Sequence, residues 1–224
     1  MKVILFGATG MVGQAVLREC LLAPDVETVL AVGRSATGQQ NPKLRELVRP
    51  DLLDLGPVEG ELKGYDACFF CLGVSSAGMT EDAYRRLTFD LTLSVAGLLA
   101  RLNPTMAFIY VSGAGTDSTE QGRSMWARVK GRTENALLRL PFRAVYLFRP
   151  GYIQPMHGIT SRTPLYRALY VVIAPLFPLF RGLAANQVST SEQVGRAMLE
   201  VVRQRGPSRV LEIREINALA PTGR

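Results

Sequence analysis

The sequence predicts an α/β fold in which helices cover both faces of a doubly wound parallel sheet. Apolar, strand-like runs alternate with helical patterns along the chain, and this order produces right-handed crossovers between parallel strands. Several runs are apolar at consecutive positions, as strands are when both faces are covered: VILF at 3–6, ACFF at 67–70 and AFIYV at 107–111. The 224 residues suit one domain with a full core better than two. We therefore expect a single domain over residues 1–224.

The alternation gives each element an approximate place. Strands are expected at 2–6, 28–34, 65–73, 106–113, 142–151 and 209–213, with one more before 51–54, and helices at 11–22, 81–102, 124–140 and 191–204. Between residues 151 and 190 the pattern lapses into Pro, Arg and aromatic residues. There we expect a small helical insertion on the substrate side, outside the carboxyl ends of the strands. The alternative is a helical pack that closes one edge of the sheet.

The composition favours a globular protein that binds a small anionic ligand. Apolar residues make up 47% of the chain and charged residues 20%, which argues against long disordered stretches. The formal net charge is +7, but the Arg residues are scattered and no basic run is interleaved with aromatic residues. A phosphate-bearing small molecule therefore explains the charge better than nucleic acid does.

The cysteines and the apolar segments predict a cytoplasmic protein without a membrane span. Cys20, Cys68 and Cys71 are odd in number and lack the spacing of a disulfide framework. The apolar run near Met1 stops at a glycine turn, unlike a signal peptide. The apolar segment 165–180 is interrupted by Arg and Pro and is too short for a bilayer, so it is expected to be buried or to form a homodimer surface, with an interfacial helix as the alternative. No metal site is expected.

A glycine motif directly after the first expected strand indicates a dinucleotide. The stretch GATGMVG has the spacing GxxGxxG and opens the next helix. The first Gly permits a tight turn, the second lets the backbone approach a pyrophosphate, and the third lets the helix pack on the strand. The residues expected to bind the cofactor here are Gly7, Thr9, Gly10, Met11, Val12 and Gly13.

The end of the second strand favours NADP over NAD. The acidic residue that binds the ribose 2′-hydroxyl of NAD is missing, and Arg34 and Ser35 stand where a 2′-phosphate would lie. A solvated Arg at a strand end is the simpler alternative. After the third strand, Asp51 is expected to bond the adenine and Leu52 to pack on it, although both residue types are also common in turns.

Together these motifs resemble the atypical short-chain dehydrogenase/reductases, which have an NAD(P)-binding Rossmann fold. The similarity rests on GxxGxxG, DLLD at 51–54, CLGVSS at 71–76, YVSGAG at 110–115, the helix with Lys130, and FRPGYI at 148–153. Within that group the chain is most similar to the NAD-dependent epimerase/dehydratase-like and Tat-interacting-protein-like members. The resemblance covers nearly the whole chain.

The resemblance implies a catalytic Tyr and Lys with a nearby hydroxyl residue. Lys130 matches the Lys, which binds the nicotinamide ribose, but Trp126 stands at the position of the Tyr. Indole cannot act as the general acid that the phenol provides. The serine pair after the fifth strand reads Ser112-Gly113, so Ser112 is the remaining hydroxyl candidate.

Further cofactor residues follow from the same resemblance. Around the fourth strand they are Cys71, Leu72 and Gly73, with Ser75 reaching toward the phosphates; beside the nicotinamide they are Pro150 and Gly151. Each of these also suits an ordinary loop. Tyr152 and His157 could each supply the proton of the missing phenol. For His157, a loop histidine without a catalytic role is the favoured interpretation.

Two functions remain open from the sequence. The first is an NADP-linked oxidoreductase or epimerase/dehydratase that acts on a small carbonyl or hydroxyl compound. The second is a catalytically inactive NADP(H)-binding sensor or interaction protein, which the Trp126 and Gly113 positions favour.

Overall fold

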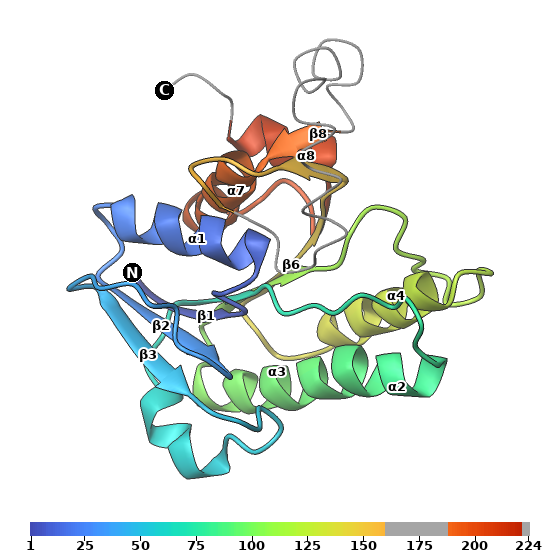
Figure 1. Cartoon of the computed structure of the whole chain (residues 1–224), viewed down its shortest axis with the longest axis horizontal. Helices are drawn as coiled ribbons and strands as arrows, with labels where there is room; N and C mark the ends of the chain where they lie inside the picture. Colours follow the sequence, from blue (N-terminus) through green and yellow to red (C-terminus); the bar gives the residue numbers. More distant parts are fainter. Residues whose placement is uncertain (160–187, 221–224) are drawn as a thin grey trace.

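The computed structural model describes residues 1–159 and 188–220 and confirms the doubly wound α/β fold (Figure 1). Its main sheet has seven strands in the order β3-β2-β1-β4-β5-β6-β9, all paired in parallel. The strands are β1 (Lys2–Phe6), β2 (Thr28–Gly33), β3 (Leu44–Val48), β4 (Ala67–Phe70), β5 (Ala107–Val111), β6 (Ala144–Arg149) and β9 (Val210–Glu212). The chain builds one half of the sheet outward from β1 to β3 and then crosses back to β4.

Helices cover both faces of this sheet, as Figure 1 shows. On one side lie α1 (Met11–Leu22), α7 (Ser191–Gln204) and α8 (Ile213–Leu219); on the other lie the 3-10 helix η1 (Gly56–Leu62), α2 (Glu81–Arg85), α3 (Leu91–Leu102) and α4 (Met125–Leu137). Strand β1 shows why: Val3 and Leu5 join one core, whereas Ile4 and Phe6 join the other. Because successive side chains of a strand face opposite sides, consecutive apolar residues are needed to fill both cores.

The expected helix at 81–102 forms, but it is not uniform. A π-helical segment, η2 (Arg86–Asp90), separates α2 from α3. The helical segment begins where Thr80 caps it, since the Thr80 side chain accepts a hydrogen bond from the Ala83 amide. Periodicity alone does not register one extra residue in a turn, because the apolar face continues on either side of it.

Strand β3 lies at the edge of the sheet, and its exposure explains its weak sequence signal. In LRELV only Leu47 is buried, and the other side chains are partly or fully exposed. Edge strands carry charged residues that discourage pairing with other chains. An apolar run therefore marks the central strands but not this one.

The segment expected as a substrate-side insertion starts and ends at paired strands. Strand β7 (Tyr152–Gln154) pairs in parallel with β8 (Val188–Thr190) in a separate two-stranded sheet. Helix α7 follows directly, and a capping box between Thr190 and Gln193 caps its amino-terminal end. The apolar segment 165–180 lies outside the described residues, so its expected role as a homodimer surface stays a prediction, as do the limits of the insertion.

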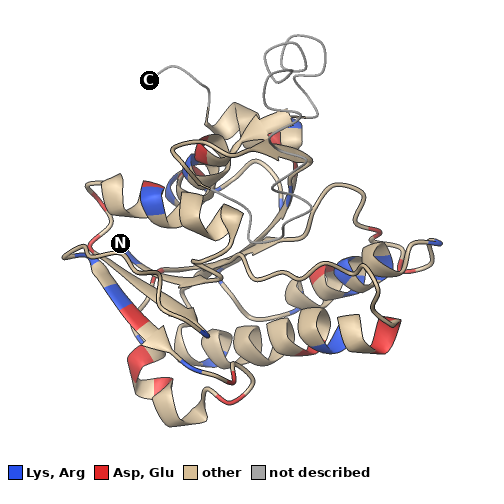
Figure 2. Ribbon diagram, viewed as in Figure 1, with Lys and Arg blue, Asp and Glu red and all other residues tan. Residues whose placement is uncertain are grey.

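Charge is mixed over the described part of the molecule. Figure 2 shows Lys and Arg beside Asp and Glu on the same elements, for example on α4 and α7. Such mixing differs from the single-sign stripe that a nucleic-acid surface presents. Among residues 1–159 and 188–220, no helix is both long and apolar enough to cross a membrane.

Candidate functional site

The candidate site begins at the turn after β1, in the crevice where the strand order reverses. Gly7 has φ +82°, and a Cβ placed on it would lie 2.7 Å from the carbonyl carbon of Cys71. The Gly10 amide donates to the Gly7 carbonyl over 2.9 Å and closes the turn. Only Gly accommodates both the left-handed backbone and the close approach of the segment after β4.

The other two glycines of the motif have different surroundings. A Cβ on Gly13 would lie 2.0 Å from the Gly7 carbonyl oxygen, so this position permits the contact between α1 and the turn. A Cβ on Gly10 would meet only that same oxygen, at 3.4 Å, and otherwise faces open space. The first turn of α1 has no side-chain cap and no acidic residue. Its free amides and open backbone fit a bound phosphate.

A cleft of about 710 Å³ runs from this turn to α4. It brings together most of the residues predicted from sequence: Gly7, Thr9, Gly10, Met11, Val12, Arg34, Cys71, Leu72, Gly73, Ser75, Ser112, Trp126 and Lys130. A second hollow of about 350 Å³ adjoins it and shares Gly7, Thr9, Arg34 and Leu72. The two hollows form a continuous groove across the carboxyl ends of β2, β1, β4 and β5.

The second hollow has the features expected at the adenosine end of a dinucleotide. Arg34 and Ser35 line it and are exposed, and Leu52 lines it while 5% exposed. Among the residues that the structure describes, no carboxylate lies within ion-pairing distance of Arg34. Asp51, in contrast, is exposed outside this hollow, and its carboxylate accepts from the Leu53 amide at 2.8 Å.

Lys130 forms part of the cleft wall at its other end. Its side chain is 6% exposed; Nζ donates to the Val111 carbonyl over 3.3 Å and lies 5.0 Å from the centroid of the Tyr110 ring. Burial lowers the pKa of the ammonium to about 8, and the Glu134 carboxylate partly opposes that shift. A lysine of this kind changes protonation near neutral pH.

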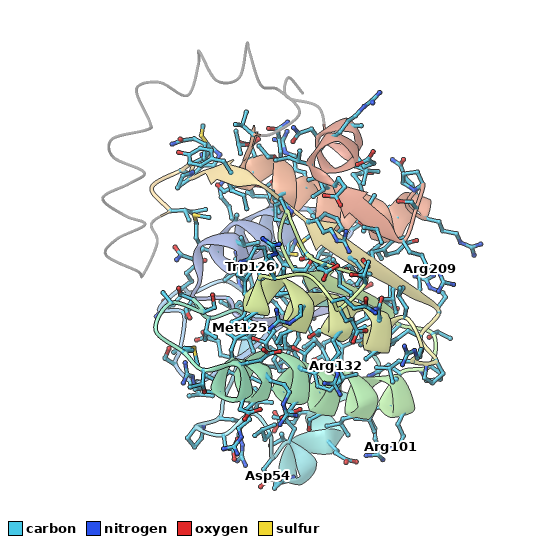
Figure 3. All side chains as sticks on the ribbon, turned by 90° about the vertical axis from the view of Figure 1, so that its right-hand side faces the viewer. Asp54, Arg101, Met125, Trp126, Arg132 and Arg209 are labelled. Carbon is cyan, nitrogen blue, oxygen red and sulfur yellow. The ribbon has the colours of Figure 1, made fainter. Side chains whose placement is uncertain are left out.

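Trp126 lies one helical turn before Lys130 and also lines the cleft. Figure 3 shows it at the amino-terminal end of α4, beside Met125. The indole is partly exposed, and a Cβ on Gly115 would lie 3.5 Å from its ring. The small residue at 115 therefore leaves room for the large ring.

Ser112 lines the cleft, but its hydroxyl is bound to the protein. Its Oγ lies 2.5 Å from Glu134 Oε1 and 3.1 Å from the Phe148 carbonyl. Glu134 is 1% exposed and forms an ion pair with Arg149, whose Nε is 3.1 Å from the same Oε1. Arg149 also binds Glu212 at 3.2 Å and Ser118 at 2.5 Å.

A profile of the NAD dependent epimerase/dehydratase family matches residues 3–124, which include the glycine turn, β1 to β5 and the start of the cleft. The chain belongs to this family.

The chain is also similar to several relatives and solved structures. The chain is 24% identical over 202 residues to the mitochondrial protein fmp52-2 of Aspergillus terreus, covering 89% of this chain and 85% of that one. It is 26% identical over 155 residues to protein HTATIP2 of Rattus norvegicus, covering 68% and 62%. The enzyme WbmF of Bordetella bronchiseptica, solved with NAD⁺, shares the fold with a TM-score of 0.68 at 15% identity, covering 100% and 79%.

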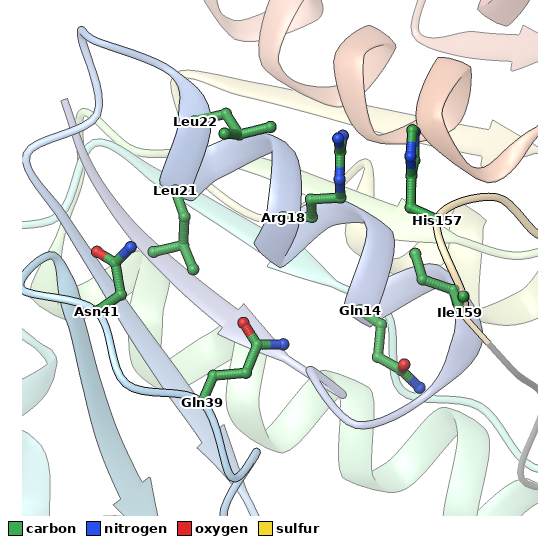
Figure 4. Close-up of a pocket in the computed structure, with 9 residues that line it drawn as sticks. Gln14, Arg18, Leu21, Leu22, Gln39, Asn41, His157 and Ile159 are labelled. Carbon is green, nitrogen blue, oxygen red and sulfur yellow. The ribbon is translucent and has the colours of Figure 1, made fainter.

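Four residues expected near the nicotinamide of a family member do not line the cleft. Pro150 instead accepts from the Ala114 amide over 2.9 Å, and Gly151 follows it. Tyr152 donates to Gln154 over 2.9 Å. His157, with φ +56°, binds Glu192 at 2.7 Å and lines a separate hollow with Arg18 and Gln14 of α1 (Figure 4). Neither Tyr152 nor His157 lines the cleft.

Tyr84 and Glu134 were not predicted from the sequence. Tyr84 of α2 lines the cleft while 2% exposed, and no motif marks it. Glu134 lies four residues after Lys130, so helical spacing places it on the same face. Its pairing with Ser112 and Arg149 depends on two strands far away in sequence, and no local signal reveals that.

Proposed function

We propose that this protein is an NADP-linked oxidoreductase, or a related enzyme of the epimerase/dehydratase type, that acts on a small carbonyl or hydroxyl compound. The observation that carries the proposal is the continuous groove from Arg34, past the glycine turn, to Lys130. It has a cation at one end, open helix amides in the middle and a buried amine at the other end. This order matches the 2′-phosphate, the pyrophosphate and the nicotinamide ribose along a bound NADP.

NADP is preferred because Arg34 has no acidic partner among the described residues and stands at the end of β2. A 2′-phosphate there gains a charge-assisted hydrogen bond that the hydroxyl of NAD does not. Thr9, Gly10, Met11 and Val12 would hold the pyrophosphate at the amino end of α1. Leu52 would pack on the adenine.

When bound, a nicotinamide cofactor supplies or accepts a hydride at the substrate carbon. Lys130 would bind the nicotinamide ribose, as the resemblance to the short-chain dehydrogenase/reductases implies. Trp126 would form an apolar wall beside the substrate and exclude water from it. The proton that accompanies the hydride must come from another group, because the indole has no acidic proton.

A second candidate function is an NADP(H)-binding sensor without catalysis. Two observations favour it: Trp126 replaces the expected phenol, and the Ser112 hydroxyl is bound to Glu134. Such a protein would use cofactor occupancy to change its surface.

Binding is tested first with the emission of Trp126, the only tryptophan in the chain. NADPH and NADH are titrated separately, and quenching and energy transfer to the reduced ring are recorded. We expect saturable quenching that is tighter for NADPH. If calorimetry and emission both show no binding of either nucleotide, the cofactor proposal is wrong.

Trp126→Tyr separates the enzyme from the sensor. The variant restores the phenol one turn before Lys130 and should raise the rate of carbonyl reduction over a panel of aldehydes. The gain reaches the full range of about 10² to 10⁴-fold that a general acid contributes only where no other residue supplies the proton. Trp126→Phe is the matched control, since it has no hydroxyl. Equal inactivity of all three proteins, each with cofactor bound, would favour the sensor.

The cytoplasm is the proposed compartment, because Cys20, Cys68 and Cys71 are unpaired thiols that suit a reducing environment. Several relatives carry "mitochondrial" in their names, so the mitochondrion is the alternative where the source cell has one. Fractionation of cells that produce the full chain distinguishes the two. A homodimer is also proposed, and a strictly monomeric protein in sedimentation would contradict it.

A further inference from the structure

Among residues 1–159 and 188–220, few groups in the cleft can exchange a proton with a substrate. The ionisable residues of this described part that line it are Arg34, Cys71, Tyr84 and Lys130. Arg34 lies at the opposite end of the groove, and its guanidinium does not release a proton. Burial raises the pKa of the Cys71 thiol and of the Tyr84 phenol, so both become weaker acids. Lys130 remains.

Ser112 does not supply the missing proton, because its hydroxyl donates to groups of the protein. The two acceptors within reach of its hydroxyl are Glu134 Oε1 at 2.5 Å and the Phe148 carbonyl at 3.1 Å. The ion pair with Arg149 holds that carboxylate in place. A hydroxyl with its proton committed in this way can accept a hydrogen bond from a substrate but cannot donate one.

We propose that Lys130 is itself the proton-exchanging catalytic residue of this site, in place of the missing phenol. Lys130 lines the cleft one turn from Trp126, and its Nζ contacts the Val111 carbonyl and the face of Tyr110. Neither of these groups takes up its proton. The inference rests on the proposed oxidoreductase function.

In carbonyl reduction, the Lys130 ammonium gives one proton to the substrate oxygen. An N–H bond of Lys130 breaks and an O–H bond forms, while the carbonyl carbon receives a hydride from the reduced nicotinamide and the π electron pair passes to the oxygen. The carbonyl compound is reduced to an alcohol and NADPH is oxidised to NADP⁺. The neutral amine then recovers a proton from solvent once the alcohol has left.

The surroundings of Lys130 suit this exchange. Burial lowers its pKa to about 8, so that both protonation states are accessible near neutral pH. The charged and titratable groups around it are Glu134 on its own helix, Tyr110 on β5, Tyr84 on α2, Cys71 after β4 and Arg149 on β6. Of these, Glu134 opposes the shift, and its carboxylate is ion-paired with Arg149.

The first test needs no cofactor. The chain contains Lys2, Lys43, Lys63 and Lys130, few enough to resolve by NMR after isotope labelling of lysine. The signal that disappears in Lys130→Arg is followed against pH. Titration near pH 8 supports the proposal, and titration near the ordinary value of about 10.5 overturns it.

The second test measures activity against pH. We expect aldehyde reduction to fall as pH rises through about 8, because the ammonium is lost, and alcohol oxidation to rise over the same range. Lys130→Arg keeps the positive charge but cannot release its proton, so it should bind NADPH and lose about 10² to 10⁴-fold of the rate. Lys63→Arg, on the exposed Lys63 far from the cleft, is the matched control.

The outcomes separate the two proposals. Turnover that survives Lys130→Arg, or that is abolished by Tyr84→Phe instead, overturns the role of Lys130 and leaves the oxidoreductase intact. A wild-type protein that binds NADPH but reduces no aldehyde contradicts both the proposed oxidoreductase function and this inference. If Lys130→Arg does not fold, Lys130→Ala is used with added methylamine: rescue of the rate supports the proposal, and its absence in a folded, NADPH-binding variant contradicts it.

Discussion

At the residue scale, the glycines of the turn have separable tasks. Gly13→Ala forces a Cβ to 2.0 Å from the Gly7 carbonyl oxygen and should lower the free energy of unfolding by about 1–3 kcal/mol. Gly10→Ala fits the fold but fills the space for a pyrophosphate, so NADPH should bind about tenfold more weakly or worse. Gly97→Ala, in α3 with no atom near its Cβ, is the control and should be neutral or slightly stabilising. Urea unfolding and NADPH titration measure both effects.

Lys130→Met tests the cost of burying the ammonium. Since the folded pKa is about 8 and the ordinary value is 10.5, the unfolded state binds more protons between these values, and the wild type gains stability as pH rises through that window. Below about pH 8 the full penalty applies, roughly 3 kcal/mol. The variant should therefore be more stable than the wild type at neutral pH, by up to that amount.

The advantage of Lys130→Met should shrink as the pH approaches 10.5, which urea unfolding at several pH values would show. Lys63→Met, on an exposed side chain, is the control and should show no such dependence. A constant difference at all pH values would mean that the stability change comes from packing and not from charge.

At the scale of elements, the Glu134–Arg149 pair joins α4 to β6. Glu134 is 1% exposed, so Glu134→Gln removes the buried countercharge of the half-buried Arg149 guanidinium, which keeps its pair with the exposed Glu212, and should destabilise the fold by up to about 3 kcal/mol. The double variant Glu134→Gln/Arg149→Met removes both charges and should recover part of the loss. Free energies of unfolding from urea titration of the wild type, the two single variants and the double variant form a double-mutant cycle. Additive losses would show that the two residues do not couple.

At the scale of the whole molecule, cofactor binding should stabilise the fold. NADPH at about 100 times its Kd should add about 2.7 kcal/mol to the free energy of unfolding, and NADH at the same concentration should add less. Arg34→Gln should reduce the effect of NADPH to that of NADH. Arg139→Gln, on an exposed Arg outside the groove, is the control. Thermal shift measurements compare the stabilisation by NADPH with that by NADH. Equal stabilisation of the wild type by both nucleotides would show that Arg34 does not bind the 2′-phosphate.

Most of the fold was predictable from local pattern. Continuous apolar runs predict the central strands, because both faces of these strands are buried. The GxxGxxG motif predicts the turn, because only Gly permits that backbone conformation. The position of the edge strand β3 was not predictable, since an exposed strand lacks an apolar run. The π-helical segment η2 was not predictable either, since one extra residue does not disturb the helical period.

The sequence by itself determined the fold class, the glycine turn and the absence of a phenol one turn before Lys130. Only the tertiary structure decided which chemical groups meet at the site. It directs the Ser112 proton to Glu134, takes Tyr152 and His157 to other partners, and adds Tyr84 to the cleft wall. The physical reason is that a hydrogen bond or a pKa depends on neighbours that the fold brings together from different strands. Burial and backbone conformation, in contrast, produce a periodic pattern of residue types in the sequence.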